Sequence, residues 1–288
     1  MCGRARAVFH NQSAINQVSE ALNLSSRDRD TLGSVNVQNA SPGCELPIYT
    51  KNTDNTDQDK NELGNYSIQL MHYGLIPVYQ KKDEKLDWYR MFNARSEGIK
   101  SSPVFSKLLK QNSRGVLIIS GFYEWKYDEK IKCKQPYYIY SENNNDKKDE
   151  DKKDDIDSQH QPLYLAVLFD NIWGKTFKSF TIITTSTDKC NLKSIHNRMP
   201  VVLRSAEQAT KWIEVGELDD HVLTKSSLSY YKINKKVGKP SCQDEDLIMK
   251  IKEPKSITSF FSPVKRKVKD EKDEEEESSS NSNKAMKK

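Results

Sequence analysis

The sequence contains no long apolar run. No stretch approaches the roughly 20 consecutive apolar residues that a membrane-spanning helix needs, and the first residues lack the apolar core of a secretory signal peptide. Only 35% of the 288 residues are hydrophobic. We therefore expect a protein of the cell interior that does not enter a membrane, and we expect part of its length to lie outside any packed core.

Cysteine is scarce, and its spacing is irregular. The five cysteines are Cys2, Cys44, Cys133, Cys190 and Cys242. Their odd number and the absence of paired spacing argue against a disulfide framework and against a zinc site. We predict reduced thiols, no metal and no cofactor.

Large apolar side chains are almost missing from three segments, residues 52–62, 141–161 and 252–288. Such segments bury too little surface to offset the entropy lost on ordering. We predict a single domain over residues 2–240 with disordered insertions at about 52–62 and 141–161. A disordered tail should follow over residues 241–288.

Removing these three segments changes the charge of what remains. The formal net charge is +5, the two insertions contribute −3 and −4, and residues 252–288 contribute +2. The remaining core therefore carries +10. A domain this basic indicates a polyanionic partner, although excess lysine also serves solubility.

The patterning favours strands over helices. Apolar residues at helical spacing predict a helix after Ser13, with Ser13 as its N-cap, and a second helix after Pro103. A third helix should begin at Ser205, where Gln208 completes a capping box. β-Branched and aromatic runs predict strands at residues 116–119, 137–140, 163–169, 180–184 and 200–203. Because strands do not alternate with helices, we predict an α+β fold, a single mainly antiparallel β domain with a few helices.

The N-terminal residues Met1-Cys2 carry a possible reactive group. Cysteine is small enough for Met1 to be removed, which would leave Cys2 with a free α-amine beside its thiol. In reference peptides the two groups titrate near ~8 and ~8.5, so a fraction of each is nucleophilic at neutral pH. Such a 1,2-aminothiol traps an aldehyde twice, first through nitrogen and then through sulfur. On its own, this start favours an ordinary frayed terminus.

Polar residues also interrupt apolar sequence elsewhere. Glu124 lies between aromatic residues after an apolar strand, a setting that favours a proton donor and acceptor. His196 lies between Ile195 and Arg198, ahead of another strand. Taken singly, Glu124 is equally a strand-end residue pointing to water, and His196 is equally a histidine at a core edge.

Five segments in order resemble a known family. They are Cys2-Gly3-Arg4, Gly74-Leu75-Ile76-Pro77, Asn93-Ala94-Arg95-Ser96-Glu97, Gly121-Phe122-Tyr123-Glu124-Trp125 and Ile195-His196-Asn197-Arg198-Met199-Pro200. Together they closely resemble the SOS-response-associated peptidase (SRAP) family, whose members form covalent crosslinks to abasic sites in single-stranded DNA. The resemblance spans roughly residues 2–215.

The resemblance implies a role for each matching residue. Cys2 matches the nucleophile, Asn93 the residue that orients the terminus and the sugar, Glu124 the acid/base, and His196 the group that assists sugar ring opening. Arg4, Arg95 and Arg198 match arginines that hold backbone phosphates. Tyr73 stands where many members have tryptophan, and we expect it to stack on a base.

The implied activity is a lyase-type DNA repair reaction. The Cys2 amine would form an imine with the open sugar, and the thiol would then close a thiazolidine. Two alternatives remain open. One is a cysteine-type peptidase, whose substrate can be as limited as its own Met1, and the other is a non-covalent single-strand-binding module.

The tail adds two signals. Ile257, Phe260 and Phe261 resemble the apolar half of a sliding-clamp-binding (PIP-box-like) peptide within 254–261, although Pro254 replaces the usual glutamine. The basic cluster at 265–269 resembles a nuclear-localisation signal, although such runs are often only solvated charge. We expect a monomer in the nucleus, with the cytoplasm as an alternative, and the replication sliding clamp as a possible partner.

Overall fold

The computed structural model describes residues 3–52, 65–129, 132–142, 160–174, 176–218 and 228–251. The chain divides into two units, Met1–Ile251 and Lys252–Lys288. The predicted clamp-binding residues Ile257, Phe260 and Phe261 and the basic cluster at 265–269 lie outside the described residues. No helix within the described part is long and apolar enough to cross a membrane.

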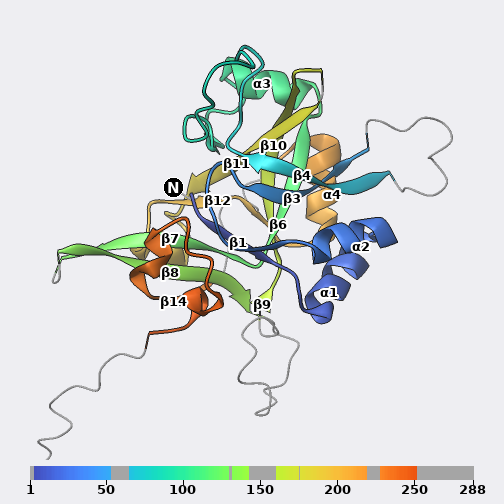
Figure 1. Ribbon diagram of the computed structural model, residues 1–288. Helices are drawn as coiled ribbons and strands as arrows, with labels where there is room; N and C mark the ends of the chain where they lie inside the picture. Colours follow the sequence, from blue (N-terminus) through green and yellow to red (C-terminus); the bar gives the residue numbers. More distant parts are fainter. Residues whose placement is uncertain are drawn as a thin grey trace, which may run out of the picture. The chain divides into compact units, whose positions relative to one another are not determined.

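The first sheet contains the start of the chain. Its strands are β1 (Ala5–Val8), β2 (Asn36–Ala40), β7 (Gly121–Asp128), β8 (Cys133–Glu142), β9 (His160–Gln161) and β14 (Ser229–Lys232). They follow the order β14-β8-β7-β1-β2, with β9 paired to β8 (Figure 1). The β8–β9 pair joins Ser141 to Gln161 and Glu142 to His160. The predicted insertion at 141–161 was therefore too wide, because both of its ends are paired strand.

The second sheet closes on itself. Its strands are β3 (Glu45–Lys51), β4 (Tyr66–Tyr73), β5 (Asn93–Arg95), β6 (Arg114–Ile119), β10 (Leu163–Ile172), β11 (Phe177–Ser186), β12 (Arg198–Pro200) and β13 (Val202–Leu203). The order is β12-β11-β4-β3-β6-β10-β13, and β10 also pairs with β11, which closes a ring of five strands. β11 runs parallel to β4 and β5, whereas its other pairings are antiparallel. The prediction of a mainly antiparallel α+β domain is confirmed.

In the part of the chain that the structure describes, four α-helices lie on the outside of the sheets (Figure 1). They are α1 (Gln12–Leu22), α2 (Ser26–Gly33), α3 (Pro103–Lys110) and α4 (Ala206–Val215). The helices predicted after Pro103 and from Ser205 are confirmed, and the Ser205 hydroxyl accepts from the Gln208 N–H as the capping box requires. The predicted Ser13 cap was wrong. Asn11 caps α1, because its side-chain oxygen accepts from the Ser13 N–H at 2.8 Å.

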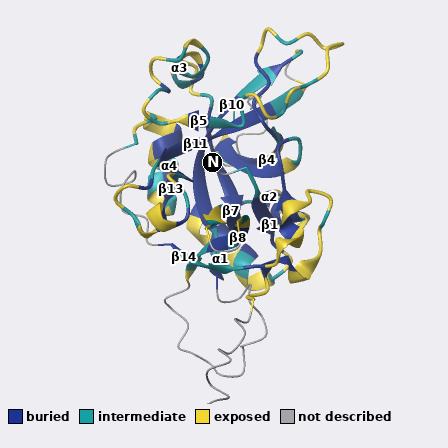
Figure 2. Cartoon of the chain, turned by 90° about the vertical axis from the view of Figure 1, so that its left-hand side faces the viewer, coloured by how far each residue is buried: buried dark blue, intermediate teal, exposed yellow. Residues whose placement is uncertain are grey.

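The sheet of β1, β7 and β8 is covered on both faces. Phe122 and Ile139 belong to the main apolar core, whereas Tyr123 and Tyr138 belong to a second, smaller core. Successive strand residues point to opposite faces, so each strand contributes to both cores. The interior strands are correspondingly buried (Figure 2).

The second core is completed by the end of the described chain. Two 3₁₀ helices, η4 (Lys235–Gly238) and η5 (Glu245–Ile248), supply Val237, Leu247 and Ile248 to it. Ile233 and Lys250 also form an isolated β-bridge. The compact unit therefore continues to Ile251, beyond the predicted boundary at residue 240, because residues 241–251 bury apolar side chains that composition alone did not separate from the tail.

Candidate functional site

Glu124 lies on β7 and is only 4% exposed. It follows Phe122 on the face directed to the main core, and it pairs with Tyr137 of β8. Its Oε2 accepts from the Trp125 backbone N–H at 3.3 Å. The expectation of a carboxyl group in an apolar setting agrees with this burial, and the alternative of a strand-end residue pointing to water is wrong.

The start of the chain runs beside Glu124. β1 pairs antiparallel with β7 through Ala5 and Phe122, and the Tyr123 N–H donates to the Arg4 carbonyl at 3.0 Å. Continuing this register brings Gly3 level with Glu124. Cys2, the predicted nucleophile, lies outside the described residues. The start of β1 lies near β7 and β11 in both overall views (Figures 1 and 2).

β5 brings Asn93 and Arg95 beside β11. It runs parallel to β11, with Asn93 opposite Ile182 and Arg95 opposite Thr184. Asn93 is partly buried and Arg95 is exposed. Because side chains alternate along a strand, both lie on the same face of β5. The Asn93 amide and the exposed Arg95 guanidinium thus lie two residues apart on β5, beside β11.

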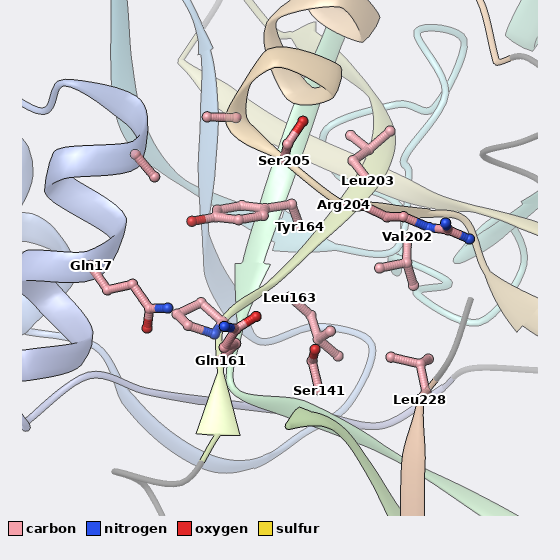
Figure 3. Close-up of a pocket in the computed structure, with 13 residues that line it drawn as sticks. Gln17, Ser141, Gln161, Leu163, Tyr164, Val202, Leu203, Arg204, Ser205 and Leu228 are labelled. Carbon is pink, nitrogen blue, oxygen red and sulfur yellow. The ribbon is translucent and has the colours of Figure 1, made fainter. Parts of the chain in front are cut away.

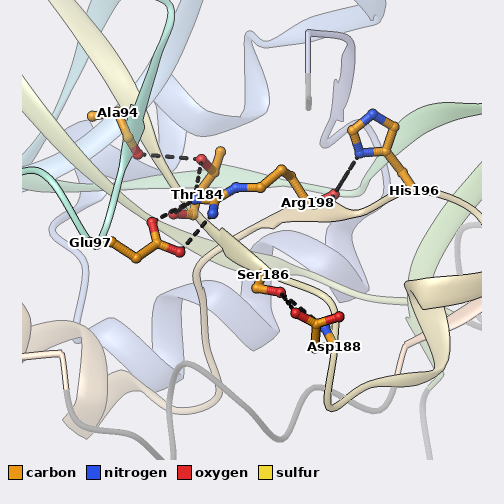
Figure 4. A network of polar contacts seen from close by, with 7 residues as sticks. All are labelled: Ala94, Glu97, Thr184, Ser186, Asp188, His196 and Arg198. Carbon is orange, nitrogen blue, oxygen red and sulfur yellow. Dashed lines mark hydrogen bonds and ion pairs between the residues drawn. The ribbon is translucent and has the colours of Figure 1, made fainter.

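β12 brings His196 and Arg198 to the other side of β11. Ser186 pairs with Arg198, and His196 lies two residues before Arg198, the first residue of β12 (Figure 4). The Arg198 backbone N–H donates to His196 Nδ1 at 3.0 Å, and the Thr187 hydroxyl donates to the His196 carbonyl at 2.6 Å. Both the backbone and the ring of His196 are therefore held.

A chain of contacts connects Glu124 in the first sheet with the His196 segment, which leads into β12 of the second sheet. Tyr137, opposite Glu124, packs edge-on against Tyr230 with ring centroids 5.9 Å apart. The Tyr230 hydroxyl lies 3.2 Å from the Ser194 hydroxyl, two residues before His196. Residues far apart in sequence thus meet where the two sheets approach one another.

The structure gives Arg198 a protein partner. Its guanidinium makes two bonds to the Glu97 carboxylate, at 2.6 and 3.0 Å, and donates to the Thr184 carbonyl at 2.6 Å (Figure 4). The bonds from Arg198 are the main reason that the pKa of the Glu97 carboxyl is lowered. The Arg198 side chain is only 14% exposed. A phosphate would have to compete with Glu97 for this guanidinium.

Arg4 is also engaged within the protein. It donates to the Asn39 side-chain oxygen at 2.7 Å and to the Gly238 carbonyl at 2.9 Å, and it lies 5.9 Å from the centre of the Trp125 ring. Partial burial lowers the pKa of its guanidinium. Ala5 belongs to the main core, on the same face of the sheet as Glu124. Because successive side chains point to opposite faces, the Arg4 side chain lies on the other face.

The prediction that Tyr73 stacks on a base was wrong. Tyr73 is completely buried, with its ring stacked on Phe180 at 5.3 Å and edge-on to Phe92 at 6.1 Å. Its place at the end of a strand that packs into the main core explains this burial. Two exposed aromatic residues that sequence reasoning missed, Tyr79 and Tyr89, lie in the segment between β4 and β5 and are 59% and 58% exposed.

This segment could have been noticed from its composition. Residues 88–92 read Trp-Tyr-Arg-Met-Phe, an aromatic-rich run with a cation. In the structure the Arg90 guanidinium lies 6.0 Å from the centre of the Tyr79 ring. Glu97 was also missed as a partner of Arg198, although it belongs to the same motif as Asn93 and Arg95.

One cavity of about 460 Å³ lies away from this constellation, between α1 and the start of α4 (Figure 3). Its lining includes Gln17, Gln161, Tyr164 and Arg204, and none of the predicted site residues. Burial raises the pKa of Tyr164 to about 12. Among the described residues no group of three or more His, Cys, Asp or Glu side chains could hold a metal ion.

A protein-family model described as SOS response associated peptidase (SRAP) matches residues 1–240. The chain is 29% identical over 250 residues to the mouse (Mus musculus) abasic site processing protein HMCES, covering 76% of this chain and 67% of the relative. It is 31% identical over 193 residues to the Xenopus tropicalis protein of the same name, covering 62% of this chain and 54% of that relative.

The fold also matches a solved structure. A crystal structure of a protein from Bacteroides thetaiotaomicron superposes with a TM-score of 0.60 at 20% sequence identity, covering 87% of this chain and all of the other. At this identity the likeness concerns the fold alone.

Proposed function

Because the chain belongs to the SOS response associated peptidase (SRAP) family, we propose that it processes abasic sites in single-stranded DNA by forming a covalent crosslink with them. Relatives in mouse and frog are named abasic site processing proteins. The observation that carries the proposal is the buried Glu124 carboxyl beside the start of β1, with the His196 segment packed against the same region.

The crosslink would join Cys2 to the aldehyde carbon of the open sugar. Once Met1 is removed, the Cys2 amine attacks this carbon, and loss of one water gives an imine. The thiol then adds its sulfur to the imine carbon and its proton to the nitrogen, which closes a thiazolidine. Nothing is oxidised or reduced. An imine left open promotes β-elimination and strand breakage, and ring closure prevents this.

Glu124 and His196 are suited to move the protons that these steps require. Ring opening of the sugar moves a proton from its hydroxyl to the ring oxygen, and loss of water from the first adduct needs a proton donor. A carboxyl group at 4% exposure, on the strand next to the start of the chain, is placed to serve both steps.

His196 supplies a second proton-transfer group. Its Nδ1 lies 3.0 Å from the Arg198 backbone nitrogen and 3.2 Å from the Arg198 carbonyl oxygen, and the tautomer of the ring decides which of the two it bonds. Asn93, across β11, provides an amide that donates to and accepts from a sugar hydroxyl. Asn93 pairs with Ile182 of β11, and Arg198, two residues after His196, pairs with Ser186 of the same strand.

Binding of the strand would rely on exposed groups around this site. Arg95 is exposed beside Asn93, and Tyr79 and Tyr89 offer ring faces to bases. An arginine fork holds phosphate without reading sequence, which suits a lesion that has no base. The core charge of +10 attracts the strand from solution.

The test is to incubate the protein with an oligonucleotide that carries one abasic site. We expect a species that survives a denaturing gel and whose mass equals protein without Met1 plus DNA minus one water. Cys2→Ser should abolish it, whereas the matched change Cys44→Ser, at a half-buried thiol, should not. An uncleaved N-terminal extension should also abolish it and leave DNA affinity nearly intact.

The same experiment separates the alternatives. A non-covalent binding module would shift DNA on a native gel only. A peptidase would give no DNA adduct in any variant. An adduct formed at the same rate by the extended protein would exclude the aminothiol mechanism. Nuclear localisation and clamp binding through Ile257, Phe260 and Phe261 stay predictions.

A further inference from the structure

The cavity between α1 and the start of α4 has a firm floor (Figure 3). Its volume of about 460 Å³ falls within the range of about 300–1,000 Å³ that is usual for small-molecule sites. Tyr164 of β10 pairs on one side with Ile118 of β6 and on the other with Leu203 of β13. Strand pairing on both sides therefore holds this part of the lining in place.

Part of the wall is apolar. Leu163, Val202 and Leu228 line the cavity, and all three are buried. Leu163 belongs to β10 and Val202 to β13, whereas Leu228 directly precedes β14. These side chains offer no hydrogen bond, so this part of the cavity favours an occupant with an apolar body.

Tyr164 brings a polar group into the cavity. The residue is 8% exposed, and its hydroxyl is directed toward α1, the helix that carries Gln17 (Figure 3). Within the described residues this hydroxyl has no hydrogen-bond partner. Burial raises the pKa of Tyr164 to about 12, so the hydroxyl keeps its proton at neutral pH. It can therefore donate to an acceptor on an occupant, which offsets the cost of burying it.

The charge of the lining has one sign. Among the described residues that line the cavity, Arg204 alone has a charged side chain. The Arg204 backbone N–H donates to Gln208 Oε1 at 2.8 Å, but its exposed guanidinium has no partner within the described part of the chain. Glu207, in the first turn of α4, lines an adjoining hollow beside Tyr66 instead. The partial positive charge at the start of α4 adds to that of Arg204.

We propose that this cavity binds a small organic anion, a carboxylate or a phosphate monoester that is attached to an apolar body. The apolar body packs on Leu163, Val202 and Leu228, the anionic group binds Arg204, and an acceptor of the ligand takes the Tyr164 hydroxyl. A guanidinium holds carboxylate and phosphate alike through two parallel hydrogen bonds. The inference does not depend on the proposed function, because none of the predicted site residues lines the cavity.

The test measures binding to the full protein by isothermal titration calorimetry. Octanoate and phenyl phosphate are the probes, one for each anionic group. Octan-1-ol keeps the apolar body of octanoate without its charge, and inorganic phosphate keeps the charge of phenyl phosphate without its apolar body. Three variants are compared with the wild type: Arg204→Gln, Tyr164→Phe and the matched control Arg27→Gln, at an exposed arginine of α2.

We expect at least one of the two anions to bind at a ratio of one to one, and its control compound to bind about tenfold more weakly or not at all. Arg204→Gln should raise the dissociation constant of that anion about tenfold, because it removes a charge-assisted hydrogen bond. Tyr164→Phe should raise it about threefold or more, because it removes one neutral hydrogen bond and keeps the ring. Arg27→Gln should leave it within about twofold. The probe that binds more tightly identifies the anionic group.

Three results would overturn the proposal. The first is that neither anion binds the wild type saturably. The second is that Arg204→Gln and Tyr164→Phe bind as tightly as Arg27→Gln, and the third is that the control compounds bind as tightly as the anions. Near-ultraviolet circular dichroism checks that each variant is folded, and if Tyr164→Phe is not, Arg204→Gln at the exposed position decides alone. A failure to form an adduct with abasic DNA would defeat the proposed function and leave this binding result unchanged.

Discussion

The two faces of β7 have different tasks. Phe122 and Glu124 are directed to the main core, where the carboxyl lies beside the start of the chain. Tyr123 and Trp125 point to the other face, where they meet the second core and Arg4. One strand thus carries a candidate catalytic group on one face and the support for the N-terminal strand on the other. The single motif Gly-Phe-Tyr-Glu-Trp therefore contains residues of the catalytic face and residues of the supporting face.

The largest effect should come from the face that carries Glu124. Glu124→Gln keeps the size of the side chain and removes its acid/base capacity, so we expect the rate of adduct formation to fall about 100-fold or more. DNA affinity should change little. Single-turnover rates on an abasic oligonucleotide measure the first quantity and fluorescence anisotropy the second. An unchanged rate would remove Glu124 from the mechanism.

The next effect concerns the second core. A chain ending at Pro240 loses Leu247 and Ile248, which are 0% and 4% exposed, and the two bonds between Gln243 and Asn39. Burial of two such side chains contributes about 3–6 kcal/mol, so the free energy of unfolding should fall by about this amount. A chain ending at Ile251 should unfold at the same denaturant concentration as the full protein and should crosslink at the same rate. Equal stability of both truncated chains would contradict the conclusion that residues 241–251 stabilise the fold through the second core.

Arg4 tests whether the supporting face also meets DNA. Its two hydrogen bonds and its contact with Trp125 predict that Arg4→Ala lowers the free energy of unfolding by about 1–3 kcal/mol. We expect the salt dependence of DNA binding to stay the same. A slope of log affinity against log salt that becomes shallower by about 0.7 would instead assign one phosphate contact to Arg4.

The smallest effect is expected from Arg95. It is exposed, so Arg95→Ala should leave stability within about 0.5 kcal/mol. The slope of log affinity against log salt should become shallower by about 0.7, the value for one phosphate on a single strand. A titration at four salt concentrations is sufficient. An unchanged slope would mean that Arg95 contacts no phosphate of the strand.

Much of the fold followed from pattern. The runs around Val116, Tyr138, Leu165 and Ile182 are strands because they are β-branched or aromatic and bounded by polar residues. β1 and β5 were missed because they are short and contain alanine, arginine and asparagine, which have no strong strand preference. β1 is a strand because it pairs with β7, and β5 is a strand because it pairs with β11. Pairing with a strand that is distant in sequence leaves no pattern in the short segment itself.

The sequence by itself determined the family, the fold class and the candidate reactive groups, because five short motifs in order preserve the chemical groups a reaction needs. The tertiary structure decided which of these side chains are exposed and which are buried or bound within the protein. Tyr73 is buried, Arg198 is bound to Glu97, and Arg4 is bound to Gly238, whereas Arg95 is exposed. The reason is physical: the partner of an arginine can lie 101 or 234 residues away along the chain, and only folding brings the two within bonding distance.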